Sequence, residues 1–158
     1  MPSSRLASTF NAADESPGLL LWQITNHWQA AQRAALKPFG LTHVQFVLLA
    51  SLTWLDAEEP VTQHDLANHA ATDPMMTSQV LRVLEQRGLV DRAPHPRDRR
   101  ARALTPSPAG VDLANRAIIA VEACDRAFFK PLGKKAPAFV HMLGALRRGY
   151  DTAGESAS

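Results

Sequence analysis

The sequence predicts a mainly α-helical protein that carries one small β-hairpin, and three observations lead to this fold class. Apolar residues recur at spacings of three and four through most of the 158 residues, as they do in helices with one buried face. Thr-x-x-polar and Asp-Pro sequences mark several helix starts. Residues 88–106 differ, because brief apolar runs flank an Arg-rich turn with Pro94 and Pro96, which is typical of a hairpin.

The N-terminal segment, residues 1–16, is expected to form a flexible arm. Pro17 then opens a helix, since proline is tolerated in a first turn. That helix should end near Lys37, because Pro38 disfavours helical geometry in the residue before it and Gly40 follows. Its apolar stripe consists of Leu20, Leu21, Ile24, Trp28, Ala31, Ala35 and Leu36.

A second helix should begin after Thr42, which forms a capping box with Gln45 three residues later. Residues 56–60 read as a turn, and Val61 can then form a strand of one or two residues. The buried side of this helix should contain Phe46, Leu48, Leu49 and Leu52.

Two shorter helices follow. Thr62 and Asp65 form another capping box, which opens the first of them. Residues 71–72 are the turn, and the second helix starts with Asp73 as its cap and Pro74 at its first position. Its inner stripe consists of Thr77, Val80, Leu81 and Leu84.

Helix, tight turn, second helix and hairpin form the layout of a winged helix-turn-helix, which is expected over residues 41–106. A long helix should follow over residues 108–130, where Pro131 stops it, and a last helix over residues 136–150. The polar tail, residues 151–158, is expected to be disordered.

Positive charge is concentrated in the hairpin. The net charge of the chain is only +2, but residues 87–102 contain six arginines and two aspartates. A local basic patch of this kind is typical of a protein that binds nucleic acid, because neutralised phosphates release their counterions. No apolar run reaches the length of a membrane span, and the N-terminus has no apolar core of a secretory signal. A single cysteine fits a reducing compartment, so a cytoplasmic location is expected, with no membrane partner.

Three segments together resemble the MarR family of bacterial transcription regulators. They are LTHVQFVLLASL (41–52), VTQHDLANHAATDPMMTSQVLRVLEQRGLVDR (61–92) and PRDRRARALTPSPAG (96–110). In order, they contain the family's Leu-Thr-x-x-Gln, Leu-Ala, Leu-Glu-x-x-Gly-Leu-Val-x-Arg, Asp-x-Arg and Leu-Thr-x-x-Gly. The resemblance implies a homodimeric repressor in which the helices of residues 17–40 and 107–150 form the dimerisation region. It also implies an operator on double-stranded DNA that is an imperfect palindrome, with half-sites about one helical turn apart.

In such a protein the helix that starts after Asp73 enters the major groove with its N-terminal half. Gln79 can bond bidentately to adenine and Ser78 is a permissive reader, while Arg82 reaches guanine or a phosphate. Met75 and Met76 depart from the small polar residues of many family members. They either contact thymine methyl groups or pack internally, so sequence reading should rely more on DNA shape.

The hairpin supplies the second set of contacts. Asp98 and Arg100 occupy the Asp-x-Arg positions, where the family's Asp braces an arginine that approaches the minor groove. We expect Arg99 and Arg100 to take this role over A·T-rich sequence, with Arg97 near a phosphate. The DNA-binding set is completed by Thr62 and Gln63, whose helix start is suited to a phosphate.

Family members are commonly released from DNA by a small aromatic or anionic molecule. The candidate ligand residues are His27, Trp28 and His43, with Trp22 less favoured, because aromatic rings and a histidine can stack on a ring and meet a carboxylate. The alternative is that these residues are ordinary core, surface or capping residues.

Other functions are weaker alternatives. Cys124 lies on an apolar stripe, and a redox role would require an exposed thiol of lowered pKa. A winged-helix module that binds another protein would not need a cationic wing. His64 and His69 point apart on one helix, no Cys/His cluster has metal-ligand spacing, and no phosphate loop or nucleophile elbow occurs. We therefore expect no enzyme activity, no metal and no cofactor.

Overall fold

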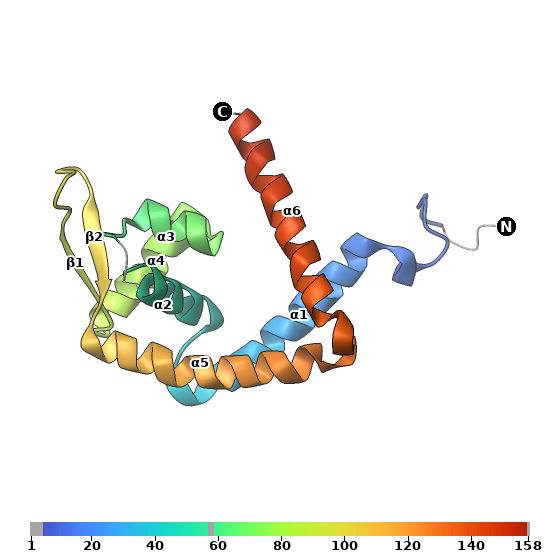
Figure 1. The fold of residues 1–158 in the computed structure, drawn as a ribbon, viewed down its shortest axis with the longest axis horizontal. Helices are drawn as coiled ribbons and strands as arrows, with labels where there is room; N and C mark the ends of the chain where they lie inside the picture. The colour runs from blue at the N-terminus through green and yellow to red at the C-terminus, as the bar shows by residue number, and fades with distance from the viewer. Residues whose placement is uncertain (1–4, 57–58, 158) are drawn as a thin grey trace. The chain divides into compact units, whose positions relative to one another are not determined.

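A computed structural model describes residues 5–56 and 59–157 and confirms a mostly helical chain with one two-stranded antiparallel hairpin (Figure 1). Its elements are α1 (Pro17–Leu36), α2 (His43–Leu55), α3 (Gln63–Ala70), α4 (Pro74–Gln86), β1 (Val90–Pro94), β2 (Arg102–Pro106), α5 (Pro108–Phe129) and α6 (Ala136–Ser156). Short 3-10 turns occupy Ala13–Glu15, Lys37–Phe39 and Lys130–Lys135. The chain divides into two compact units, residues 1–122 and 123–158.

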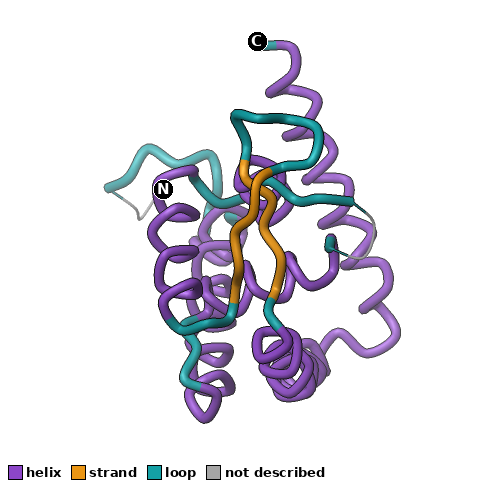
Figure 2. The backbone as a smooth tube through the Cα atoms, turned by 90° about the vertical axis from the view of Figure 1, so that its left-hand side faces the viewer, coloured by secondary structure: helices purple, strands orange, loops and turns teal. Residues whose placement is uncertain are grey.

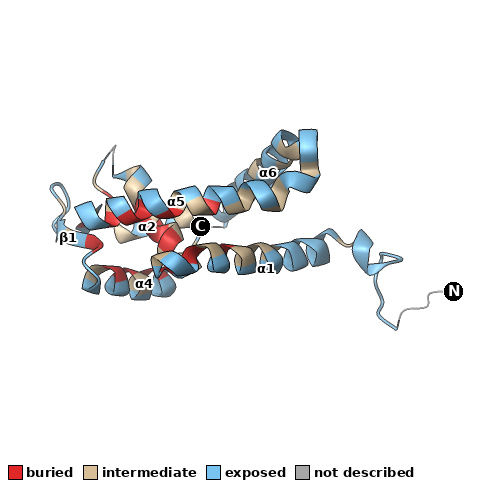
Figure 3. Ribbon diagram, turned by 90° about the horizontal axis from the view of Figure 1, so that it is seen from below, coloured by how far each residue is buried: buried red, intermediate tan, exposed pale blue. Residues whose placement is uncertain are grey.

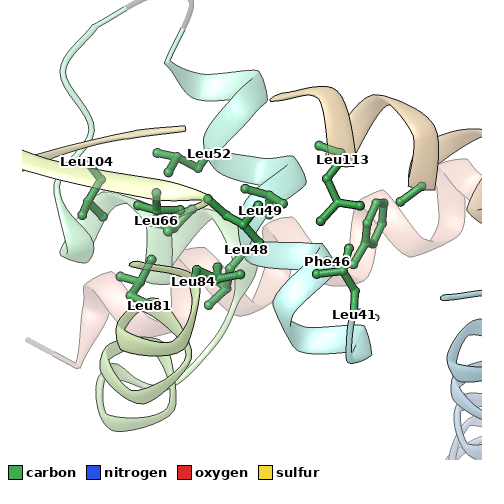
Figure 4. Packing of buried hydrophobic residues seen from close by; sticks show 14 of the residues in the cluster. Leu41, Phe46, Leu48, Leu49, Leu52, Leu66, Leu81, Leu84, Leu104 and Leu113 are labelled. Carbon is green, nitrogen blue, oxygen red and sulfur yellow. The ribbon is translucent and has the colours of Figure 1, made fainter. Parts of the chain in front are cut away.

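The core of the first unit is built around α2, whose leucines meet side chains from four other elements (Figure 4). Leu48, Leu49 and Leu52 are completely buried. Figure 3 shows further buried positions on α4 and on the first half of α5. The side chains that close this core from α3, α4, β2 and α5 are Leu66, Leu81, Leu84, Leu104 and Leu113.

The predicted helix starts carry the predicted caps. Thr42 and Thr62 each form a complete capping box, with Gln45 and Asp65 respectively. The Asp73 carboxylate accepts the N–H of Met76 at 2.9 Å, as an N-cap should. Each such cap contributes about 1 kcal/mol to the stability of its helix. These caps fix where α2, α3 and α4 begin, and so they set the position of the helix-turn-helix.

Strands β1 and β2 lie side by side in the hairpin (Figure 2), and their register pairs Val90 with Pro106 and Pro94 with Arg102. Val61 takes part in the sheet as a single residue, which is the shorter form of the strand that the sequence predicted. It makes one isolated bridge to Leu104, whose N–H donates to the Val61 carbonyl at 2.7 Å. This single bridge joins the segment before α3 to β2.

The C-terminal end differs from the sequence prediction. The last helix does not stop near Tyr150, and residues 151–156 continue α6 rather than forming a disordered tail. Thr152 and Ser156 donate their hydroxyls to carbonyls of the preceding turn, at 3.1 Å. These bonds are compatible with the helix but do not account for it, and none of α6 is buried.

No single helix among the described residues is long and apolar enough to cross a membrane. Only α1 with its 3-10 turn and α2 together, bent by 75° at their junction, meet the length and composition criteria.

Candidate nucleic-acid interface

The outer face of α4 carries the side chains that were expected to read DNA. Its inner face is anchored by Thr77, Leu81 and Leu84, which are completely buried. Met75 is 72% exposed and Met76 is 44% exposed, so the alternative that they pack internally is wrong. Ser78 is half-buried, while Gln79 and Arg82 are exposed on the same outer side.

The turn before α4 is held by hydroxyl groups. The Thr77 hydroxyl donates to the Asp73 carbonyl at 2.8 Å and lies 2.7 Å from the hydroxyl of Thr72. Ala71, which ends α3, adopts a left-handed conformation with a φ of 53°. These contacts set the angle at which the N-terminal half of α4 projects from the lobe.

The start of α3 already contains the carboxylate of Asp65, which belongs to the capping box. The N–H of Thr62 donates to Asp65, and the N–H of Asp65 donates to the Thr62 hydroxyl. Hydrogen bonding of the Asp65 carboxylate to the backbone and the side chain of Thr62 lowers the pKa of Asp65 below its ordinary value, with smaller contributions from His64 and His95. Two of the amides expected to meet a phosphate are therefore engaged within the capping box.

At the wing tip, Arg97, Arg99 and Arg100 are all exposed. The Asp98 carboxylate accepts the backbone N–H of Arg100 at 3.0 Å, so Asp98 orders the tip through the main chain. The guanidinium of Arg97 lies 3.9 Å from Glu59, in an exposed ion pair.

Arg92 connects three elements and had no role in the sequence prediction. Its Nε donates to Glu85 on α4 at 2.8 Å, and its terminal nitrogen donates to the side chain of Gln63 on α3 at 3.4 Å. Arg92 lies on β1, so this contact joins the wing to both helices of the helix-turn-helix. The sequence motif contains both Glu85 and Arg92 but does not show that they pair, and Gln63 is too distant in the chain for its contact with Arg92 to be predicted.

The candidate ligand residues are only partly brought together. Trp28 and His43 pack edge to face, with ring centroids 5.0 Å apart. Both are half-buried, whereas His27 is exposed and Trp22 is 68% exposed. The Trp28–His43 pair thus joins α1 to the start of α2, and His27 lies outside it.

An apolar hollow of about 430 Å³ lies in the unit of residues 123–158, and it includes none of the candidate ligand residues. It is lined mainly by Phe129, Leu132, Phe139, Val140 and Leu143.

Cys124 is half-buried, and burial followed by the charge of Asp125 raises the pKa of its thiol. It is therefore mostly the unreactive thiol at neutral pH. Residues 5–56 and 59–157 contain no group of three or more His, Cys, Asp or Glu side chains that could hold a metal ion.

A helix-turn-helix with an exposed polar outer helix, beside an arginine-tipped hairpin, defines a winged-helix DNA-binding protein. The MarR family model matches residues 41–101. The chain is 43% identical to the uncharacterized HTH-type transcriptional regulator YdcH of Bacillus subtilis (strain 168), over 81% of this chain and 88% of that protein. It is 36% identical to the transcriptional repressor Rv2887 of Mycobacterium tuberculosis (strain H37Rv), over 72% and 80% of the two chains. The chain belongs to the MarR family of transcription regulators, whose matched members are not enzymes.

Solved structures agree with this assignment. The transcriptional repressor CouR bound to a 23-mer DNA duplex has a TM-score of 0.76 and 26% identity, and the match covers 85% of this chain and 94% of CouR. CouR from Rhodococcus jostii RHA1 is also known bound to p-coumaroyl-CoA, at 27% identity and a TM-score of 0.76 over 86% and 92% of the two chains. Rv2887 in complex with salicylic acid has 33% identity and a TM-score of 0.66, over 85% and 99%.

Proposed function

We propose that the protein is a homodimeric repressor that binds an imperfect palindrome and is released by a small aromatic, anionic ligand. The observation that carries the proposal is the pairing of an exposed α4 face with a cationic wing. Both project from one lobe, and Arg92 ties them together. Similar proteins bound to DNA and to aromatic ligands support both halves of the proposal.

In this proposal α4 reads the major groove. Gln79 and Ser78 contact base edges, and Arg82 contacts guanine or a phosphate. The exposed thioethers of Met75 and Met76 suit thymine methyl groups, since they offer apolar contact without hydrogen bonds.

The wing would read the minor groove. Arg99 and Arg100 enter it where it is narrow, and Arg97 gives up its exposed contact with Glu59 for a phosphate. Asp98 acts by ordering the backbone of the tip. At the start of α3, Gln63 contributes its backbone N–H, which the capping box does not use, and Thr62 contributes by holding this helix start in place.

A homodimer is supported by apolar surface on the terminal helices. The exposed apolar residues of these helices are Leu19, Leu20, Leu21, Trp22 and Ile24 on α1, and Val140, Met142, Leu143 and Leu146 on α6. Apolar side chains gathered on one helix in this way usually mark an interface, and these side chains are exposed within their own units.

The ligand is proposed to bind near the Trp28–His43 pair, with His27 at the margin. Edge-to-face aromatic rings give an apolar wall, and an imidazole can hydrogen-bond a carboxylate. Aromatic acids are the chemical class with which similar proteins have been solved. A redox response through Cys124 has less support, because the pKa of this thiol is raised.

The test is selection of binding sites from a random DNA duplex pool with the purified chain. Recovery of a two-fold symmetric site, released by salicylate or a related acid, is the expected result. Generic, salt-sensitive binding without a consensus would favour a winged helix that mainly contacts another protein.

A further inference from the structure

His95 lies at the base of the wing tip and holds the tip's backbone. Its own N–H donates to the Ala101 carbonyl at 3.2 Å, which closes the loop between β1 and β2. Its ring Nδ1 accepts the backbone N–H groups of Arg97 and Asp98, each at 3.1 Å. A ring nitrogen accepts such bonds only when it carries no proton. The geometry therefore corresponds to a neutral His95 with its hydrogen on Nε2.

The hydrogen bonds of His95 connect to further backbone hydrogen bonds within the wing tip. Asp98, held by the ring, accepts the N–H of Arg100 with its carboxylate and the N–H of Ala101 with its carbonyl. The backbone of every tip residue from Arg97 to Ala101, except Arg99, thus takes part in a hydrogen bond that leads back to His95. The arginine side chains project from this framework.

We propose that His95 is a positioning residue for DNA binding, whose neutral ring folds the wing tip so that its arginines are presented to the minor groove. Protonation of His95 then loosens the tip and weakens binding. The inference rests on the proposed function, because it requires the wing to contact DNA.

Charged groups of both signs surround His95. From α3, Asp65 interacts electrostatically with His95 and with its neighbour His64. In the tip, Asp98 and Arg97 donate their N–H groups to the ring, and Arg97 also pairs with Glu59 of the segment before α3. The remaining cationic groups of the tip and of the start of β2 are Arg99, Arg100 and Arg102. His95 therefore has both carboxylates and arginines as charged neighbours.

Two effects of protonation have opposite signs. An imidazolium has no acceptor for the two amides, so the tip loses the bonds that fold it. The same added charge attracts DNA phosphates and would by itself tighten binding. A histidine that acts only as a surface charge would therefore give stronger binding at low pH, whereas a positioning histidine gives weaker binding.

The test compares the full-length wild-type chain with His95→Asn and His95→Ala on the selected operator. Asparagine places its Oδ1 where the ring has Nδ1, and it accepts amides two and three residues ahead without titrating. At about pH 8 we expect His95→Asn to bind within about twofold of the wild type, and His95→Ala about tenfold more weakly. At about pH 5.5 the wild type should fall about five- to tenfold below His95→Asn. The other histidines are present in all three proteins, so these ratios isolate the effect of residue 95.

A second readout follows the tip without DNA. In NMR titrations the amide protons of Arg97 and Asp98 should move with the ring of His95 in the wild type and stay in place in His95→Asn. Equal DNA affinities of His95→Ala and His95→Asn at pH 8, or a wild-type to His95→Asn ratio that does not change with pH, would overturn the role of His95 alone. Failure of the wild-type chain to bind DNA at pH 8 would instead overturn the proposed function, and the role of His95 with it.

Discussion

At the scale of single residues, the winged-helix lobe contains a few positions where only the native residue fits. Gly110 is one of them. Its φ is not in the left-handed region, yet a Cβ added to it would clash with the carbonyl oxygen of Leu89. The first turn of α5 therefore approaches the chain at the start of the hairpin so closely that only glycine fits. Ser107 fixes the same junction, because its hydroxyl donates to the Gly88 carbonyl at 2.6 Å and accepts the Gly110 N–H.

We predict that Gly110→Ala destabilises the protein by about 2–4 kcal/mol, since backbone must move to admit the methyl group. The matched control is Gly149→Ala in exposed α6, where an added Cβ meets nothing within 4 Å. This control should be neutral or stabilise by up to about 1 kcal/mol. Urea unfolding of both variants gives the comparison, and equal stabilities would contradict the close approach.

Arg92 is a second residue whose contacts reach beyond its own strand. Arg92→Ala removes the bonds to Glu85 and Gln63 and should lower stability by only about 1 kcal/mol, because the pair is partly exposed. The larger effect should be on DNA binding, which we expect to weaken about tenfold as the wing loses its fixed angle to the helices. Arg116→Ala, which breaks an exposed ion pair on α5, is the control of equal charge. Band-shift titrations compare the DNA affinities of the two variants. A wild-type affinity of Arg92→Ala would show that the contacts of Arg92 with Glu85 and Gln63 do not contribute to DNA binding.

At the scale of elements, the sequence predicted local features well and long-range ones poorly. The Thr42, Thr62 and Asp73 caps were predictable because a cap needs only residues within one turn. The joint of Arg92 with Glu85 and Gln63, and the ring contacts of His95, were missed because they depend on how the hairpin folds onto the helices. The extension of α6 was missed because its polar last turns carry no periodic apolar signal.

The wing as an element yields a prediction about salt. Arg99→Ala together with Arg100→Ala should weaken operator binding by several kcal/mol, because two phosphate-neutralising charges and their minor-groove contacts are lost. The slope of log affinity against log salt concentration should become shallower by about 2. Fluorescence anisotropy at several salt concentrations measures both quantities. An unchanged slope at unchanged fold stability would mean that the tip does not meet the DNA.

The α4 helix yields a prediction about specificity. Met75→Ser with Met76→Ser removes apolar surface that is already exposed, so stability should change by less than about 0.5 kcal/mol. Preference for thymine at the contacted positions should fall by about 1 kcal/mol, the value of one buried methyl contact, while Met75→Leu with Met76→Leu keeps it. Repeating the site selection with both double variants shows whether the preference depends on the apolar side chains. If the serine variant selects the same consensus, Met75 and Met76 do not read thymine, and the preference at those base pairs comes from DNA shape alone.

At the scale of the whole molecule, the apolar faces of α1 and α6 connect assembly with DNA affinity. Leu146 on α6 is 67% exposed, so Leu146→Glu should leave the single chain folded while it places a charge in the proposed dimer interface. We expect this variant to become monomeric in light scattering and to lose about 100-fold in operator affinity, because linked half-sites bind together far more tightly than one half-site does. Trp54→Glu is the matched control, since Trp54 is 79% exposed on α2 and lies outside the terminal helices. A Leu146→Glu protein that stays dimeric would move the interface elsewhere. A monomer that keeps wild-type affinity would show that one lobe suffices, and the operator would then have no need of two-fold symmetry.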